Sequence, residues 1–197
     1  MILAIDTSGA IAVAAVDGDA VVAERSEFAP RGHAELLADM VHGVLAEAGE
    51  RPERIVVGTG PATFTGLRVG LVTARTLAYA WGIEADGVCS LDALGIQFGT
   101  CTVVTDARRK EVYWAHYVDG ERVSGPLVAA PHDVPVSGPV YGRGALLYPD
   151  VFVDATAADP NPAHLVRAAT VAAASGVHMS TEPLYLRRPD VHGVPGA

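Results

Sequence analysis

The feature that most constrains the fold of this chain is an apolar strand that leads through a glycine turn directly into a long helix. Residues 54–58 are rich in β-branched side chains, which favours a buried strand. Gly58 and Gly60 permit backbone angles that side chains forbid, and Pro61 cannot donate a hydrogen bond to a sheet. A helix is expected over residues 66–82. With 50% apolar and only 6% aromatic residues, this arrangement predicts a tightly layered α/β protein.

Small residues recur at every fourth position of the predicted helix. Gly66, Gly70, Ala74 and Ala78 therefore share one face and form a shallow groove. Such a face allows a second helix to come unusually close, and the pattern by itself leaves open which chain supplies that helix. The helix expected over residues 33–48 has an apolar face that is wider than one contact with a sheet requires, which indicates a second packing partner for it as well.

Around this centre the chain alternates between strands and helices, and the elements up to residue 99 form a complete sheet-and-helix unit. Its other strands are expected over residues 2–6, 10–17, 20–28 and 84–88, and its other helices over residues 33–48 and 91–98. In the second half, strands are expected over residues 101–107, 111–119, 122–129 and 139–142, and a helix over residues 162–175. We therefore predict an N-terminal lobe of residues 1–99, a C-terminal lobe of residues 100–187 and a flexible tail of residues 188–197.

The charge balance of the chain is acidic, because 14 basic and 23 acidic residues give a net charge of −9. A protein that binds nucleic acid by itself normally presents a concentrated basic surface. Any contact with RNA is therefore expected to depend mainly on another subunit. The basic cluster at residues 108–110 lies at a predicted hairpin tip and is either a solvated turn or a local RNA contact.

The apolar stretches of the chain are short, and none is long enough to span a bilayer. The N-terminal segment reaches Asp6 without a basic region or a long apolar run, so it is expected to form a strand and not a signal peptide. These features predict a cytoplasmic protein that does not associate with a membrane. Cys89 and Cys101 lack a Cys-x-x-Cys spacing and are expected to be buried, reduced thiols.

One group of residues is a candidate for contact with a phosphate. Asp6, Thr7 and Ser8 follow the first strand, where actin-like ATPases and sugar kinases place an acid that holds a metal-bound water beside the phosphates. A hydroxyl and backbone N–H groups next to such an acid can bind phosphate oxygens. Alternatively, Asp6 only caps a turn, as Asp often does. Arg68, one turn into the central helix, either meets an anion or pairs with an acid on a neighbouring element.

Other familiar sites are absent from the sequence. The central turn has Thr63 where a dinucleotide-binding fingerprint has its third glycine, and it lacks the Gly-Lys-Ser/Thr of a P-loop. No two of the seven histidines have the spacing that directs metal ligands to one side of a helix. The serines lack the Gly-x-Ser-x-Gly pattern of a hydrolase nucleophile. We therefore expect no catalytic residue and no metal site.

Several segments, in the same order along the chain, resemble the TsaB family, also called YeaZ. They are ILAIDTS at 2–8, Arg31-Gly32-His33, GTGPATFTGLRVG at 58–70, DARRKEVYWAHY at 106–117 and PLYLR at 183–187. The resemblance implies an actin/hexokinase-like (ASKHA) fold with two small lobes, each with a mixed sheet and flanking helices. The chain departs from the family pattern at Ala62-Thr63, where Gly-Ser is common, and in a short second lobe between residues 120 and 165.

The resemblance also implies a function. TsaB proteins are accessory subunits that join the paralogous transferase TsaD and the ATPase TsaE. TsaD places the threonylcarbamoyl group on the adenosine 3′ of the anticodon in tRNAs that read ANN codons. By this resemblance the chain is a non-catalytic scaffold that contacts TsaD directly, meets tRNA indirectly and forms a homodimer when TsaD is absent. We expect no cofactor of its own, and the sequence leaves open whether Asp6, Thr7 and Ser8 bind ATP or ADP weakly within the complex.

In TsaB-like proteins the first two helices form the contact with TsaD, and in this sequence these are residues 33–48 and 66–82. The expected interface residues are Leu36, Leu37, Met40, Val44, Gly66, Arg68, Gly70, Leu71, Ala74 and Ala78. Two other functions remain open. One is an independent ASKHA-type ATPase, kinase or glycoprotease-like enzyme, and the other is a homodimeric structural protein that uses the same helix pair.

Overall fold

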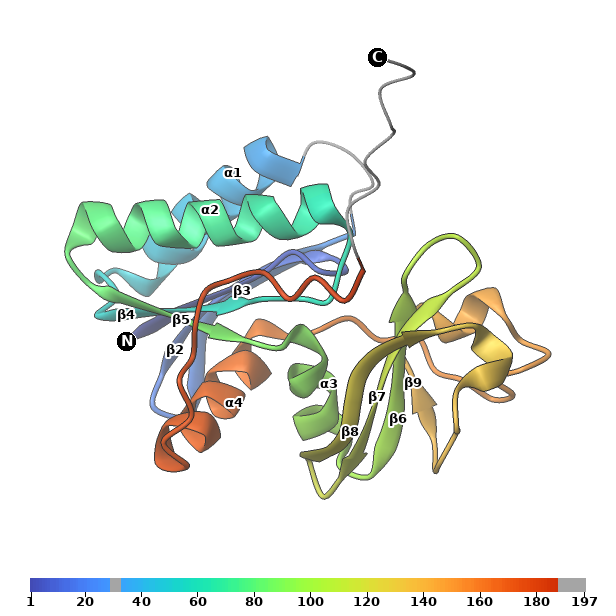
Figure 1. Ribbon diagram of the computed structural model, residues 1–197. Helices are drawn as coiled ribbons and strands as arrows, with labels where there is room; N and C mark the ends of the chain where they lie inside the picture. Colours follow the sequence, from blue (N-terminus) through green and yellow to red (C-terminus); the bar gives the residue numbers. More distant parts are fainter. Residues whose placement is uncertain (29–32, 188–197) are drawn as a thin grey trace, which may run out of the picture.

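The computed structural model describes residues 1–28 and 33–187. Its first sheet has five strands in the order β3-β2-β1-β4-β5 (Figure 1). The strands are β1 (Ile2–Asp6), β2 (Ile11–Asp17), β3 (Ala20–Glu27), β4 (Arg54–Gly58) and β5 (Glu84–Val88). β1, β4 and β5 are parallel to one another, whereas β2 pairs antiparallel with both β1 and β3. The three parallel strands therefore end at the same edge of the sheet.

Helices cover both faces of this sheet (Figure 1). α1 (His33–Ala48) and α2 (Phe64–Trp81) lie on one face, and α3 (Ser90–Phe98) and α4 (Pro162–Ala174) lie on the other side. Successive side chains of β1 alternate between the two faces, so that Leu3 and Ile5 pack in the core with α1 and α2 and Ala4 packs in the core with α4. A sheet that is buried on both faces needs apolar residues at nearly every position, which explains the continuous apolar runs of its central strands.

The second sheet has four strands in the order β8-β7-β6-β9. They are β6 (Cys101–Asp106), β7 (Val112–Val118), β8 (Glu121–Ala129) and β9 (Val140–Tyr141). α3 packs on one face of this sheet through Leu91 and Leu94. Ala93 of the same helix packs in the core beside the first sheet, so α3 contacts both sheets. The opposite face is covered by a segment that contains the 3₁₀ turns η1 (Pro131–Asp133) and η2 (Ala145–Leu147).

The predicted strands and helices are all present, each within two residues of its predicted bounds. The predicted lobes need one correction, because the end of the chain returns to the first sheet. α4 was expected in the second lobe, but Leu165 and Val166 pack it against the first sheet instead. An alanine-rich helix carries no pattern that says which sheet it covers. The predicted tail at residues 188–197 and the Arg31-Gly32 motif lie outside the described residues.

Candidate functional site

Three residues meet at the edge where β1, β4 and β5 end. Asp6 is the last residue of β1, Gly58 is the last residue of β4, and Ser90 begins α3 soon after β5. This edge of a parallel sheet is where α/β proteins commonly bind ligands. A β-carbon added to Gly58 would lie 2.5 Å from Ser90 Oγ and would overlap the Asp6 carboxylate. Glycine is therefore required at position 58, because the two polar side chains fill the space beside it.

The Asp6 carboxylate is completely buried, and its hydrogen-bonded oxygen is Oδ1, which faces Ser8. Asp6 Oδ1 accepts hydrogen bonds from the backbone N of Ser8 at 2.8 Å and from Ser8 Oγ at 2.6 Å. Burial raises the pKa of Asp6 above its ordinary value, hydrogen bonds from Ser8 and Ser90 oppose this rise, and the nearby Asp159 carboxylate adds to it. Asp159 is in turn paired with Arg143, whose Nε lies 2.6 Å from Asp159 Oδ2.

The two hydroxyl groups that follow Asp6 already have partners in this chain. Thr7 Oγ1 donates a hydrogen bond to the carbonyl oxygen of Gly66 at 2.8 Å, which ties the end of β1 to the start of α2. The backbone N and the hydroxyl of Ser8 both donate to Asp6. The structure thus brings the three predicted residues together, and its geometry matches the second of the two interpretations, in which Asp6 caps a turn.

The glycine turn between β4 and α2 is closed in the same way. Thr59 N donates to Val88 O at 2.7 Å, Gly60 N donates to Ser90 Oγ at 3.1 Å, and Ser90 N donates to Gly60 O at 2.8 Å. Sequence reasoning missed the part that Ser90 plays at this site. The available signal was the alternation of strands and helices along the chain, which favours parallel strands whose carboxyl ends lie at the same sheet edge as Asp6.

The structure corrects the residues expected at a partner interface. Eight of the ten are buried inside this chain, namely Leu37, Met40, Val44, Gly66, Gly70, Leu71, Ala74 and Ala78. A β-carbon added to Gly70 would lie 2.5 Å from Thr7 Oγ1. The small-residue face of α2 therefore packs inside the chain's own fold, with Gly66 and Gly70 against Thr7 at the end of β1 and with Ala74 and Ala78 in the core. A stripe of small residues signals a close approach, but it does not identify the element that approaches.

The outer faces of the two helices carry a different set of residues. Leu36 of α1 is partly exposed and Arg68 of α2 is exposed, and these are the two predicted interface residues that lie at the surface. Val72 and Tyr79 are 60% and 91% exposed. They are seven residues apart and so share one face of α2, where they form an apolar strip that faces solvent.

Arg68 has aromatic partners in place of the anion or acid that was expected. Its guanidinium lies over the ring of Phe64, with 3.7 Å from Cζ to the ring centroid. Its Nε donates a hydrogen bond to the hydroxyl of Tyr185 at 3.0 Å. Arg68 therefore joins the start of α2 to a segment near the C-terminus of the described chain.

The basic hairpin tip is a tight turn. Arg108, Arg109 and Lys110 have φ angles of 62°, 53° and 62°, which place all three in the left-handed region. Arg108 also pairs with Asp106, with 2.9 Å between Arg108 Nη1 and Asp106 Oδ2. This geometry fits the solvated-turn interpretation, and the RNA contact stays a prediction.

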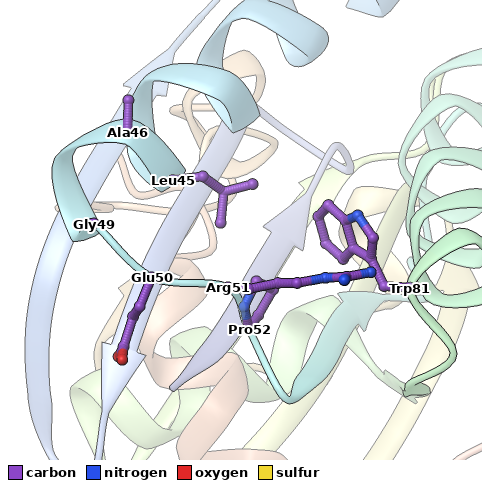
Figure 2. A pocket seen from close by; sticks show the side chains of 7 residues that line it. All are labelled: Leu45, Ala46, Gly49, Glu50, Arg51, Pro52 and Trp81. Atoms are coloured by element: carbon purple, nitrogen blue, oxygen red, sulfur yellow. The ribbon is translucent and has the colours of Figure 1, made fainter.

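A shallow concavity of about 450 Å³ lies between the C-terminal ends of α1 and α2 (Figure 2). It is lined by Leu45, Ala46, Gly49, Glu50, Arg51, Pro52 and Trp81. The Arg51 guanidinium lies over the Trp81 ring, with 5.4 Å from Cζ to the ring centroid. Trp81 ends α2, whereas Thr7 contacts Gly66 near the start of that helix. The length of α2 therefore separates the concavity from the Asp6 end of the sheet.

Two further predictions concern metal ligands and thiols. Within residues 1–28 and 33–187, no group of three or more His, Cys, Asp or Glu side chains is placed to hold a metal ion. Cys89 and Cys101 are both free thiols, but only Cys101 is buried as expected, whereas Cys89 is partly exposed. Among the helices of the described chain, none combines the length and the apolar character needed to cross a membrane.

Comparisons with known proteins identify relatives of this chain. Residues 23–134 match the family model described as TsaD, tRNA N6-adenosine threonylcarbamoyltransferase. An uncharacterized protein of Mycobacterium leprae is 41% identical over 201 residues, which cover 96% of this chain and 55% of that protein. The tRNA threonylcarbamoyladenosine biosynthesis protein TsaB of Bacillus subtilis is 36% identical over 124 residues, which cover 59% of this chain and 54% of TsaB. The matches therefore span about half the length of these two relatives.

A solved structure matches over almost its whole length. YeaZ from Pseudomonas aeruginosa superposes on this chain with a TM-score of 0.78 at 30% sequence identity. The superposition covers 94% of this chain and 99% of the YeaZ chain. Both sheets and their helices therefore have counterparts in a single protein of similar size.

Proposed function

The chain belongs to the TsaB/YeaZ family and has its actin/hexokinase-like fold, and from this premise we propose that it is an accessory protein in the synthesis of threonylcarbamoyladenosine on tRNA. In this proposal TsaD transfers the threonylcarbamoyl group to the adenosine 3′ of the anticodon in tRNAs that read ANN codons. The present chain binds TsaD, works with TsaE and supplies no reacting group.

The observation that supports an accessory role is that the polar donors at the Asp6 end of the sheet already form hydrogen bonds within the chain. A phosphate group is bound through free backbone N–H and hydroxyl donors. Here the hydroxyls of Thr7 and Ser8 and the backbone N–H groups of Ser8 and Gly60 all donate within the chain. A nucleotide would have to break several of these bonds, so we expect ATP and ADP to bind weakly or not at all to the isolated chain.

The proposed contact with TsaD lies on the outer faces of α1 and α2. The buried residues of these helices pack in one core with the first sheet and are not accessible to a partner. A partner therefore meets Leu36, Val72 and Tyr79, which the fold leaves partly or largely exposed. In the absence of TsaD, a second copy of the chain would cover the same strip. With a net charge of −9, the chain is expected to meet tRNA only through its partners.

Reconstitution tests this function. Purified TsaD, TsaE, tRNA and the threonylcarbamoyl donor are combined with and without the chain, and modified adenosine is measured by mass spectrometry. We expect product with the chain and only background product without it. Equal product in both reactions would contradict the proposal. Steady ATP turnover or proteolysis by the chain alone would favour the alternative of an independent enzyme.

A second measurement separates a scaffold from a self-sufficient homodimer. The chain is mixed with increasing TsaD and its mass is followed by light scattering. A scaffold gives up its self-contact and forms the mixed complex, because both contacts use the same face of α2. A homodimer that persists at excess TsaD would favour the structural alternative.

A further inference from the structure

After α4 the chain runs back across the edge of the first sheet toward the start of α2 (Figure 1, red). We call residues 179–187 of this segment the strap. β5 is the last strand of its sheet, and its Gly87 N donates a hydrogen bond to Met179 O at 3.0 Å. Farther along, Leu184 N donates to Thr59 O at 2.8 Å in the glycine turn. The strap thus covers the edge of β5 and then the turn that lies beside Asp6.

Two arginines of α2 hold the strap from one side. Arg75 donates to Thr181 Oγ1 at 2.9 Å and to Thr181 O at 2.6 Å, and it pairs with Glu182 Oε1 at 2.7 Å. Arg68 donates to the hydroxyl of Tyr185, as described above. These contacts join the strap to the outer face of α2.

The far end of the strap reaches the second sheet. Arg187 Nη1 donates to the carbonyl oxygen of Ala107 at 3.2 Å, and the same guanidinium pairs with the carboxylate of Glu111. Ala107 and Glu111 flank the turn between β6 and β7. A single short segment therefore bridges the first sheet, α2 and the hairpin of the second sheet.

The strap is attached by the polar contacts just described and by the stacking of the Tyr185 ring on the Phe64 ring of α2. None of its nine side chains is buried, and Met179 is its one member packed at the margin of a hydrophobic core. Segments with few buried apolar contacts are the ones that open locally while the rest of a protein stays folded. Exposed ion pairs contribute little to stability and weaken with salt. The strap is therefore expected to open locally more readily than the helices and strands packed in the cores.

We propose that the strap is a releasable lock between the two sheets. While it is closed, Arg187 holds the β6–β7 hairpin in a fixed position relative to α2 and β5. Once it is released, the sheets turn relative to each other about α3, which packs on both. The lock is a property of the chain alone and does not depend on the proposed function.

One consequence does rest on the proposed function. Arg68, Val72, Arg75 and Tyr79 are spaced by four, three and four residues and so share the outer face of α2. A partner that docks on this face meets the strap and the two arginines that hold it. Docking would then control whether the lock is open or closed.

Hydrogen exchange tests the attachment of the strap. We expect Arg75→Ala to speed the exchange of the Gly87 and Leu184 amides about tenfold, because it removes several hydrogen bonds of a charged donor. Exchange in β1 should not change. Arg25→Ala is the matched control, because Arg25 forms a comparable exposed ion pair with Glu47 and should leave the strap unaffected.

A distance measurement tests the lock. Spin labels are placed at Thr76→Cys on α2 and Lys110→Cys on the β6–β7 hairpin, both of which are exposed positions. In the wild-type background the distribution of distances between the labels should be narrow. In the Arg187→Ala background it should broaden or shift. If the Leu184 amide exchanges faster in Arg187→Ala but the distance distribution is unchanged, the strap only covers the edge of the sheet and the lock is overturned. Unchanged exchange in Arg75→Ala would overturn the attachment as well.

Discussion

Gly70→Ala is expected to destabilise the isolated chain, because the small-residue face of α2 packs on the chain's own strand. The added β-carbon would lie 2.5 Å from Thr7 Oγ1, which is closer than side-chain atoms approach in folded proteins. Thr7 would have to move, and its hydrogen bond to Gly66 O would lengthen or break.

The change in the free energy of unfolding is the sum of two costs and one gain. Overpacking of a well-packed core costs about 1–3 kcal/mol, and loss of the Thr7 hydrogen bond costs about 1 kcal/mol. Replacing glycine by alanine inside a helix favours folding by about 1 kcal/mol. The net change in the free energy of unfolding is a loss of about 2 kcal/mol, which corresponds to a fall of about 4–8 °C in Tm for a chain of this size.

Gly43→Ala is the matched control. Gly43 also lies inside a helix, α1, but a β-carbon added there has no atom within 4 Å. Only the gain in helix propensity of about 1 kcal/mol remains, so Tm should rise by about 2–4 °C. Both variants are measured by thermal unfolding followed by circular dichroism. If Gly70→Ala were as stable as Gly43→Ala, the groove of α2 would be free, and its packing against β1 as described here would be wrong.

Three further outcomes are expected. Burial raises the pKa of Asp6, so the folded chain binds a proton more tightly than the unfolded chain. The free energy of unfolding therefore falls as pH rises above the ordinary carboxyl pKa. Asp6→Asn should raise Tm at neutral pH and flatten the dependence of Tm on pH. Burial raises the pKa of the Cys89 thiol to about 12 and that of Cys101 to about 11, so iodoacetamide at pH 8 should label both much more slowly in the folded chain than after unfolding. Gly95→Ala would overlap the ring of Tyr117 and should lower the free energy of unfolding in urea by about 2 kcal/mol.

The elements of this fold could be predicted because their signals are local. β-Branched runs mark the strands, and the glycine turn after β4 marks the start of α2. The contacts between these elements, by contrast, depend on residues that are far apart in the sequence. Ser90 meets Asp6 only because β1, β4 and β5 are parallel, and that arrangement has no signature within either segment.

The predicted interface shows the same limit at the level of side chains. The stripe that contains Gly66 and Gly70 was correctly identified as a place of close approach. The partner in that approach is Thr7, which lies 59 residues before Gly66 in the sequence. In the sequence the strap was noted only through PLYLR at 183–187, a segment that resembles the family, because its attachment depends on Arg68 and Arg75 of a helix more than a hundred residues earlier.

The most direct test of the proposed accessory role is the yield of modified tRNA as the chain is titrated into a fixed amount of TsaD and TsaE. With the wild-type chain, yield should rise from background and level off near equal amounts of chain and TsaD. A variant with Tyr79→Asp places a charge on the exposed strip of α2 without touching the core, so it should remain folded and should need a large excess to reach the same yield. A yield that does not depend on the amount of wild-type chain would contradict the account.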